Sequence, residues 1–186
     1  MTIDELLRET ESKMKKSVEA TRHEFTLIRT GRANPAMLEP IVVTAYGAEM
    51  GLAQLASITV PDPRQLLITP FDKNTLSAIE KAIQKSDLNL TPNSDGIAIR
   101  LNIPPLNEER RKELTKQLHK KAEHGLAAIR NVRHDCNNHL RNLTKNREIG
   151  EDDEKRALDK VQKMTDRHSA EIDAAAKAKE RELLEV

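Results

Sequence analysis

The sequence is short of aromatic residues. Its 186 residues include no tryptophan, and the aromatic side chains are those of Phe25, Tyr46 and Phe71. RNA-recognition sheets and oligonucleotide-binding barrels stack bases on rows of aromatic rings. Three scattered rings cannot form such a row. Any binding of nucleic acid must therefore depend mainly on contacts to phosphate groups.

Cysteine and long apolar runs are also scarce. Cys136 is the single cysteine, which excludes an intramolecular disulfide, favours a reducing compartment and predicts a small buried side chain. No stretch of 18 apolar residues occurs, and no basic segment leading into an apolar run stands at the N-terminus. We therefore expect a soluble, cytoplasmic protein with no membrane association.

Charge is abundant and unevenly distributed. Charged residues make up 33% of the chain, yet the formal net charge is only +1. Residues 110–147 contain 11 basic and 3 acidic residues, whereas residues 148–186 contain 8 basic and 12 acidic ones. This segregation indicates a polyanionic partner for the basic stretch more than it indicates uniform solubility.

Three segments carry apolar stripes at helical spacing, with members three or four residues apart. The first stripe comprises Ile3, Leu7, Thr10, Met14, Val18, Thr21, Phe25 and Ile28. The second comprises Leu114, Leu118, Ala122, Gly125, Ile129, Val132, Cys136, Leu140 and Leu143. The third comprises Leu158, Val161, Thr165, His168, Ile172, Ala175, Lys179 and Leu183. No helix can bury such a stripe alone, so we predict a three-helix bundle.

Glycine, proline and capping residues predict where these helices begin and end. Gly31 can take the left-handed conformation that ends a helix, and Pro35 cannot continue one. Asn107 is a suitable cap for the second helix, followed by Glu108 and Glu109 at the positive end of its dipole. Ile149-Gly150 then separates the second helix, which runs to about Asn146, from the third.

Between Pro35 and Pro105 the pattern changes to that of short strands. The expected strands are Ile41–Thr44, Ser57–Val60, Leu66–Thr69 and Ile97–Ile103. The expected turns are Asp62-Pro63-Arg64 and Pro92-Asn93-Ser94-Asp95-Gly96. Leu76, Ile79, Ala82 and Ile83 predict one short helix that Asp72 or Asn74 would cap.

The predicted fold class is α+β, an elongated three-helix bundle with a small inserted α/β domain. The bundle comprises residues 1–30 and 106–186, and the α/β domain comprises residues 31–105. The chain crosses twice between the domains. We expect a hinge at these crossings, formed by Thr30, Gly31, Arg32, Ile103, Pro104 and Pro105.

The sequence offers no pattern typical of catalysis. His119 and His124 are five residues apart, as are His134 and His139, which separates each pair by about 140° around a helix. Neither pair can share one face, so we expect no metal site. A glycine-rich phosphate loop, a nucleophile elbow and a paired-carboxylate pocket are also missing. We expect a binding protein without cofactors rather than an enzyme.

One face of the second helix is unusually basic. Lys112, Lys116, Arg130, Asn137, Arg141 and Lys145 fall opposite the apolar stripe, with Arg133 on the shoulder and Glu123 intruding. A solvated face normally alternates acids with bases, and the acids are mostly missing here. Arginine suits bidentate phosphate contacts. The predicted target is a structured RNA that is recognised by shape and backbone.

Several strings in the chain resemble those of the ribosome recycling factor family. They are Arg29-Thr30-Gly31-Arg32-Ala33-Asn34-Pro35, Asp72-Lys73 with Ile79-Glu80-Lys81-Ala82-Ile83, Asp95-Gly96, Ile103-Pro104-Pro105-Leu106, Glu108-Glu109-Arg110-Arg111, Arg130-Asn131-Val132-Arg133 and Val161-Gln162-Lys163-Met164-Thr165-Asp166. The strings follow one another in order through essentially the whole chain. The layout of a bundle with an insert also matches the family.

The resemblance implies a role and a set of contacts. A member of this family enters the post-termination ribosome and, with elongation factor G and GTP, promotes its dissociation into subunits with release of mRNA and tRNA. Its bundle lies against RNA of the large ribosomal subunit through arginines that correspond here to Arg110, Arg130 and Arg133, with Arg29 and Arg32 as secondary candidates. Elongation factor G acts on the α/β domain, which swings about the hinge.

Another class of protein also fits part of the pattern. A structural coiled-coil scaffold could use the α/β insert to bind partners and leave the basic face merely solvated. Such a scaffold would be oligomeric in a sizing experiment, whereas a recycling factor would be a monomer. A hydrolase or metalloenzyme is a more distant alternative and would require a buried polar pocket.

Overall fold

The computed structural model describes residues 1–185, which divide into two compact units. The bundle unit comprises Met1–Ile28 and Lys112–Val186, and the α/β unit comprises Arg29–Arg111. These boundaries lie two to six residues away from those predicted from the sequence. No helix within residues 1–185 combines the length and the apolar character needed to cross a membrane.

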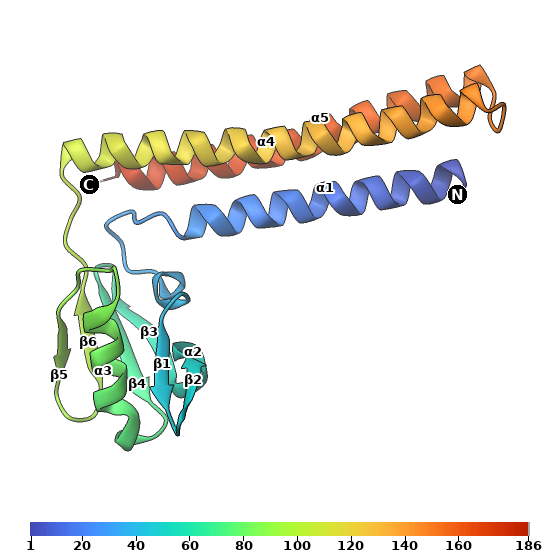
Figure 1. The fold of residues 1–186 in the computed structure, drawn as a ribbon. Coiled ribbons are helices and arrows are strands. Elements are labelled where there is room, and N and C mark those ends of the chain that lie inside the picture. The colour runs from blue at the N-terminus through green and yellow to red at the C-terminus, as the bar shows by residue number, and fades with distance from the viewer. Residues whose placement is uncertain (186) are drawn as a thin grey trace. The chain divides into compact units, whose positions relative to one another are not determined.

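The bundle unit consists of three long helices: α1 (Ile3–Thr26), α4 (Glu108–Lys145) and α5 (Glu151–Leu184) (Figure 1). The first residues of α4, up to Arg111, belong to the α/β unit. A capping box begins α1: Glu5 N donates to Thr2 Oγ1 at 3.2 Å, and Thr2 N donates to Glu5 Oε2 at 2.8 Å. Asn107 caps α4 as predicted, since its Oδ1 accepts from Arg110 N at 2.7 Å.

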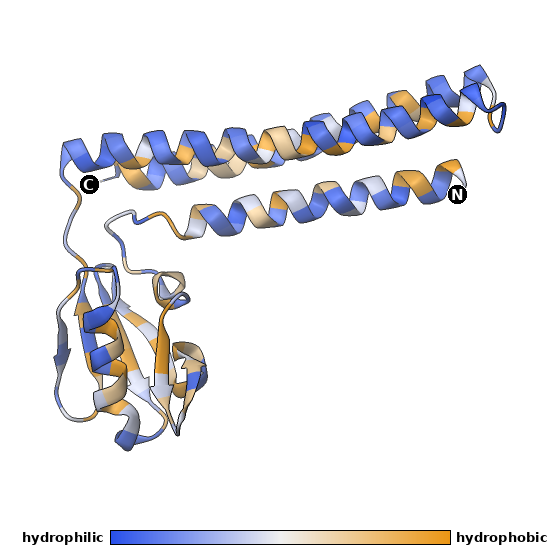
Figure 2. Cartoon of the chain, in the orientation of Figure 1, coloured by the Kyte–Doolittle hydropathy of each residue, from blue (hydrophilic) through white to orange (hydrophobic). Residues whose placement is uncertain are grey.

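The three predicted stripes form the core of the bundle unit. Most of their members are buried, and Figure 2 shows apolar residues recurring along each of the three helices. Residues from all three helices meet in one cluster formed by Leu6, Leu7, Cys136, Leu140, Ala157 and Val161. Burial raises the pKa of the Cys136 thiol, as expected for a small apolar side chain in a core.

Three members of the third stripe, Thr165, His168 and Lys179, are polar and nevertheless buried. His168 is 1% exposed, and neither ring nitrogen has a hydrogen-bond partner. Its Nε2 lies 3.8 Å from Glu11 Oε1, and its Nδ1 lies 3.6 Å from Glu171 Oε2. Lys179 is 8% exposed, and its Nζ reaches Glu182 Oε2 at 3.4 Å. The buried stripe of α5 is therefore regular in its spacing but includes polar side chains.

The α/β unit is built on an antiparallel four-stranded sheet in the order β3-β4-β6-β5. Its strands are β3 (Ala56–Asp62), β4 (Gln65–Pro70), β6 (Ile99–Asn102) and β5 (Pro92–Ser94). The helix α3 (Leu76–Lys85) and the hairpin of β1 (Val42–Ala45) and β2 (Ala48–Gly51) complete the unit, with short helical turns at α2 (Leu52–Leu55), Pro35–Leu38 and Lys73–Thr75. Leu66, Ile68, Ile79, Ile83 and Ile99 are fully buried in its core.

The hairpin that β2 forms with β1 was not predicted from the sequence. Tyr46 and Gly47 both have positive φ, 53° and 75°, as a two-residue type I′ turn requires. Tyrosine rarely adopts this conformation, and Ala48-Glu49-Met50 contains no β-branched residue, so neither the turn nor the strand was signalled. Pro92-Asn93-Ser94 was wrongly assigned to a turn: it pairs with β6 as β5, and the turn is confined to the residues that follow.

Two residues that were predicted to mark the ends of helices have different positions in the structure. Gly31 has the expected positive φ of 76°, but α1 ends at Thr26, so Gly31 lies in the connecting segment and not at the helix cap. Asp72 does cap a helical turn, because its Oδ1 accepts from Asn74 N at 3.0 Å. That turn is Lys73–Thr75, which precedes α3, and α3 itself begins without a side-chain cap.

Candidate RNA-binding surface

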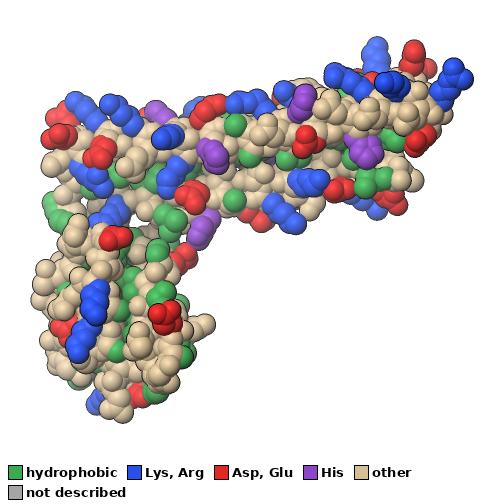
Figure 3. Space-filling model, in the orientation of Figure 1, with side chains coloured by type: hydrophobic (Ala, Val, Ile, Leu, Met, Phe, Trp, Pro, Cys, Tyr) green, Lys and Arg blue, Asp and Glu red, His purple; other side chains and the backbone are tan. Residues whose placement is uncertain are grey.

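The basic residues of α4 lie on its exposed side, away from the core of the bundle unit. Lys116, Arg130, Arg141 and Lys145 are all exposed. Figure 3 shows Lys and Arg side chains along the bundle helices, interspersed with Asp and Glu. Asn137 departs from the prediction, because it is half-buried and its Oδ1 is buried without a partner. The exposed basic face therefore does not include Asn137.

Arg130 is held by the one acid that intrudes on this face. Its Nη2 lies 2.5 Å from Glu123 Oε1, two helical turns earlier on α4. Both side chains are exposed, so the pair is well hydrated and contributes little to stability. A phosphate could replace the Glu123 carboxylate at small cost, because the guanidinium retains free directions for donating hydrogen bonds.

Arg133 is positioned differently from Arg130. It is half-buried, and its Nη1 donates to Gln162 Oε1 on α5 at 3.5 Å. The side-chain stem thus packs at the edge of the core while the guanidinium is directed along the surface between two helices. Gln162 was not recognised from the sequence as an orienting residue, because no local pattern indicates which residue of another helix will face Arg133.

Arg29 and Arg110 lie near each other in the α/β unit. Burial, and then the positive charge of Arg110, lower the pKa of Arg29. Arg29 Nη2 also donates to the backbone oxygen of Asp87 at 3.3 Å. Arg32 is exposed on the segment that follows α1. The structure therefore brings Arg29 beside Arg110 in one unit and places Arg130 one helical turn before Arg133 in the other.

The predicted hinge residues all fall inside the α/β unit. An added Cβ at Gly31 would lie 3.3 Å from Leu106 Cγ and 3.4 Å from Leu106 N, so the two connecting segments pack against each other at this point. Ile103 N donates to Arg64 O at 2.8 Å, and Ala33 N donates to Pro63 O at 2.7 Å. Both connecting segments are thereby tied to the turn between β3 and β4.

The histidines gather no ligand set. Within residues 1–185, no group of three or more His, Cys, Asp or Glu side chains is arranged to hold a metal ion. His119 lies 3.7 Å from Glu180, and His134 lies 3.1 Å from Asn138, so these rings contact single neighbours on the surface.

The chain is a two-domain binding protein. One domain is a three-helix bundle with a cationic face on its longest helix. The other is an α/β unit inserted in the sequence between the first and second helices of the bundle. The ribosome recycling factor family model matches residues 21–184. This chain belongs to the ribosome recycling factor family. It is accordingly a translation factor and not an enzyme.

The similarity extends over whole chains. The ribosome-recycling factor of Halalkalibacterium halodurans is 52% identical over 98% of both chains, and that of Legionella pneumophila is 47% identical over 99% of this chain and 100% of its own. A solution structure of the ribosome recycling factor matches with a TM-score of 0.81 and 41% identity, covering 100% of this chain and 99% of the other. A second match has a TM-score of 0.71, 48% identity and full coverage of both chains. It is described among models for the T. thermophilus ribosome recycling factor and the E. coli elongation factor G bound to the E. coli post-termination complex.

Proposed function

We propose that this chain recycles ribosomes. It binds the post-termination ribosome in the cytoplasm as a monomer and, with elongation factor G and GTP, promotes dissociation into subunits with release of mRNA and tRNA. The observation that carries this proposal is the family match, which spans the bundle unit and the α/β unit together. The second solved relative supports it, since that protein is described bound to a post-termination complex with elongation factor G.

The contact with the ribosome is made, in this proposal, through RNA of the large subunit. Arg130 and Arg133 on α4 supply phosphate contacts from the bundle unit, and Arg110 supplies one from the first turn of the same helix. Arg29 and Arg32 are secondary candidates. Because exposed rings are few, these contacts read shape and charge and not base sequence, so binding should weaken steeply as salt is raised.

The test of the function is subunit separation. Post-termination complexes are mixed with this chain, elongation factor G and GTP, and the fraction of separated subunits is measured by sedimentation. Separation that requires all three components supports the proposal. Intact complexes with all three components present, under conditions in which the Halalkalibacterium halodurans relative separates them, would contradict it.

We also propose that the two units fold independently. Each has its own core, and the α/β core comprises sixteen buried residues that all lie between Met37 and Ile103. Replacing residues 31–105 by a short Gly-Ser linker is expected to leave a helical bundle that melts cooperatively. Circular dichroism at 222 nm measures this, and a gradual, non-cooperative loss of helix would overturn the inserted-domain arrangement.

The hinge is proposed to lie at Thr30, Gly31, Arg32, Ile103, Pro104 and Pro105. Gly31→Val places a β-branched residue at a φ of 76° and pushes a side chain into Leu106, which costs about 1 to 2 kcal/mol. We expect large-subunit affinity to be retained and turnover with elongation factor G to fall. Unchanged turnover would place the hinge elsewhere. Gly96→Val is the control, because Gly96 also has positive φ but has open space around it.

A further inference from the structure

The outer edge of β1 is not paired with any strand in the described part of the chain. The hairpin register pairs Ala45 with Ala48 across a two-residue turn, so the backbone groups of Val43 also face β2. The carbonyl of Ile41 follows the same alternation, since its oxygen accepts from Leu52 N at 3.4 Å, whereas Ile41 N donates to Leu38 O at 3.2 Å. The N–H and C=O groups of Val42 and Thr44 therefore point away from β2. Both residues are exposed.

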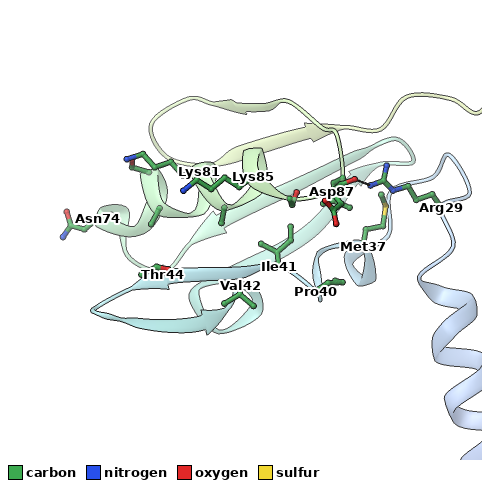
Figure 4. Close-up of a pocket in the computed structure, with 15 residues that line it drawn as sticks. Arg29, Met37, Pro40, Ile41, Val42, Thr44, Asn74, Lys81, Lys85 and Asp87 are labelled. Atoms are coloured by element: carbon green, nitrogen blue, oxygen red, sulfur yellow. Dashed lines mark hydrogen bonds between the residues drawn. The ribbon is translucent and has the colours of Figure 1, made fainter.

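A groove of 860 Å³ runs between this edge and α3 (Figure 4). Val42 and Thr44 line one side, and α3 lines the other with Lys81 and Lys85, which lie one turn apart. Small side chains on α3, those of Ser77, Ala78 and Ala82, leave the space open. A strand edge beside a helix is the arrangement in which several domains bind an extended peptide, through main-chain hydrogen bonds along the strand.

The groove is positively charged. Lys81 and Lys85 make no ion pair within residues 1–185, and Arg29 stands at one end, where Figure 4 shows it beside Asp87. Among the described residues lining the groove, the only carboxylate is that of Asp87, and Arg29 is bound to the backbone oxygen of that residue at 3.3 Å. Two lysines on the helix therefore have uncompensated charge facing the groove.

We propose that this groove binds an extended, acidic segment of a protein partner, held by the free edge of β1 and by Lys81 and Lys85. In an extended segment alternate side chains point to the same side, so carboxylates at every second position can reach the lysines in turn. No described residue lining the groove is aromatic, so single-stranded RNA would find no surface on which to stack its bases. The proposal goes beyond the recycling function, because Lys81 and Lys85 are not among the proposed RNA contacts; Arg29 at the end of the groove is shared with them.

The test uses the full-length chain and a fluorescein-labelled peptide of eight residues in which glutamate alternates with valine. Fluorescence anisotropy measures its affinity, and we expect Lys81→Glu with Lys85→Glu to weaken binding about tenfold, as the loss and reversal of two exposed ion pairs implies. Lys73→Glu is the matched control, because Lys73 is exposed in the same unit but does not line the groove. It should bind the peptide as the wild type does.

Two further measurements separate strand pairing from charge attraction. Thr44→Pro removes an outward N–H without removing a hydrogen bond of the hairpin, so the fold is retained and peptide affinity should fall several-fold. The same peptide with alternate N-methyl groups, which keeps its charge, should also bind several-fold more weakly to the wild type. Affinities that do not change in either experiment, or an octauridylate that binds this groove more tightly than the peptide, would overturn the proposal.

Discussion

Arg133→Ala is expected to weaken binding to the large ribosomal subunit about tenfold at moderate salt, because one phosphate contact in a protein–RNA interface is worth about 1 to 3 kcal/mol. The slope of log affinity against log salt should decrease by about 1, as expected when one fewer counterion is released. Helix content and melting temperature should change little, since the guanidinium lies outside the core. Sedimentation with isolated large subunits across a salt titration measures both quantities.

The expected loss depends on the fixed position of this side chain. Arg133 is half-buried and its guanidinium is hydrogen-bonded to Gln162 of α5 at 3.5 Å. Partial burial and this contact reduce the conformational entropy that is lost when a phosphate binds. Arg133→Lys should recover only part of the affinity, because an ammonium group cannot make the planar two-point contact. Gln162→Ala should produce a smaller loss than Arg133→Ala, because it releases the guanidinium without removing it.

Arg156→Ala is the matched control for the loss of one positive charge. Arg156 is exposed on α5 and is paired with Asp153 at 3.2 Å, in the segment of the chain that is net acidic. Its replacement should leave large-subunit affinity nearly unchanged. If Arg133→Ala and wild type bind equally well across the titration, the basic face of α4 is an ordinary solvated surface and RNA binding resides elsewhere.

The helices of this protein could be predicted from the sequence because their signals are local. Residues at spacings of three and four define the buried stripe of each helix, and the Asn107 cap defines the start of α4 almost to the residue. The short strands were predicted less well. β2 and β5 lack β-branched residues, and they are strands because neighbouring segments supply hydrogen-bond partners and not because of their own propensity.

The charges of the candidate site could be predicted from the sequence, but the contacts of its arginines could not. The excess of arginine and lysine on α4 is visible in the sequence, since a helix converts spacing directly into a face. The neighbours of each arginine are not visible in this way. Glu123 reaches Arg130 over two helical turns, Gln162 reaches Arg133 from another helix, and Asp87 reaches Arg29 from the far end of α3. These contacts orient Arg130, Arg133 and Arg29.

The contact between Gly125 and Thr21 is expected to be a sensitive point of the bundle core. Gly125 of α4 faces Thr21 of α1, where an added Cβ would lie 2.3 Å from Thr21 Oγ1 and 2.8 Å from Thr21 Cγ2. The threonine cannot simply turn away, because its hydroxyl donates to Ser17 O at 2.8 Å. Gly125→Val should therefore lower the free energy of unfolding by about 3 kcal/mol through overpacking.

A double-mutant cycle distinguishes this steric effect from helix propensity. Gly125→Ala alone gains about 1 kcal/mol of propensity but collides with Thr21, so its net effect should be a loss of stability. Thr21→Ala removes Oγ1 and Cγ2 and leaves only a Cβ at 3.1 Å, so the double variant should be more stable than Gly125→Ala alone. Urea unfolding of the wild type, the two single variants and the double variant measures the coupling free energy. We expect the double variant to be about 1 to 2 kcal/mol more stable than the sum of the two single effects implies. Ala128→Val serves as the control, because Ala128 lines an open groove between the same two helices. Additive effects in the cycle would mean that α1 moves away from α4 without cost, and that the contact at Gly125 does not set the spacing of the bundle.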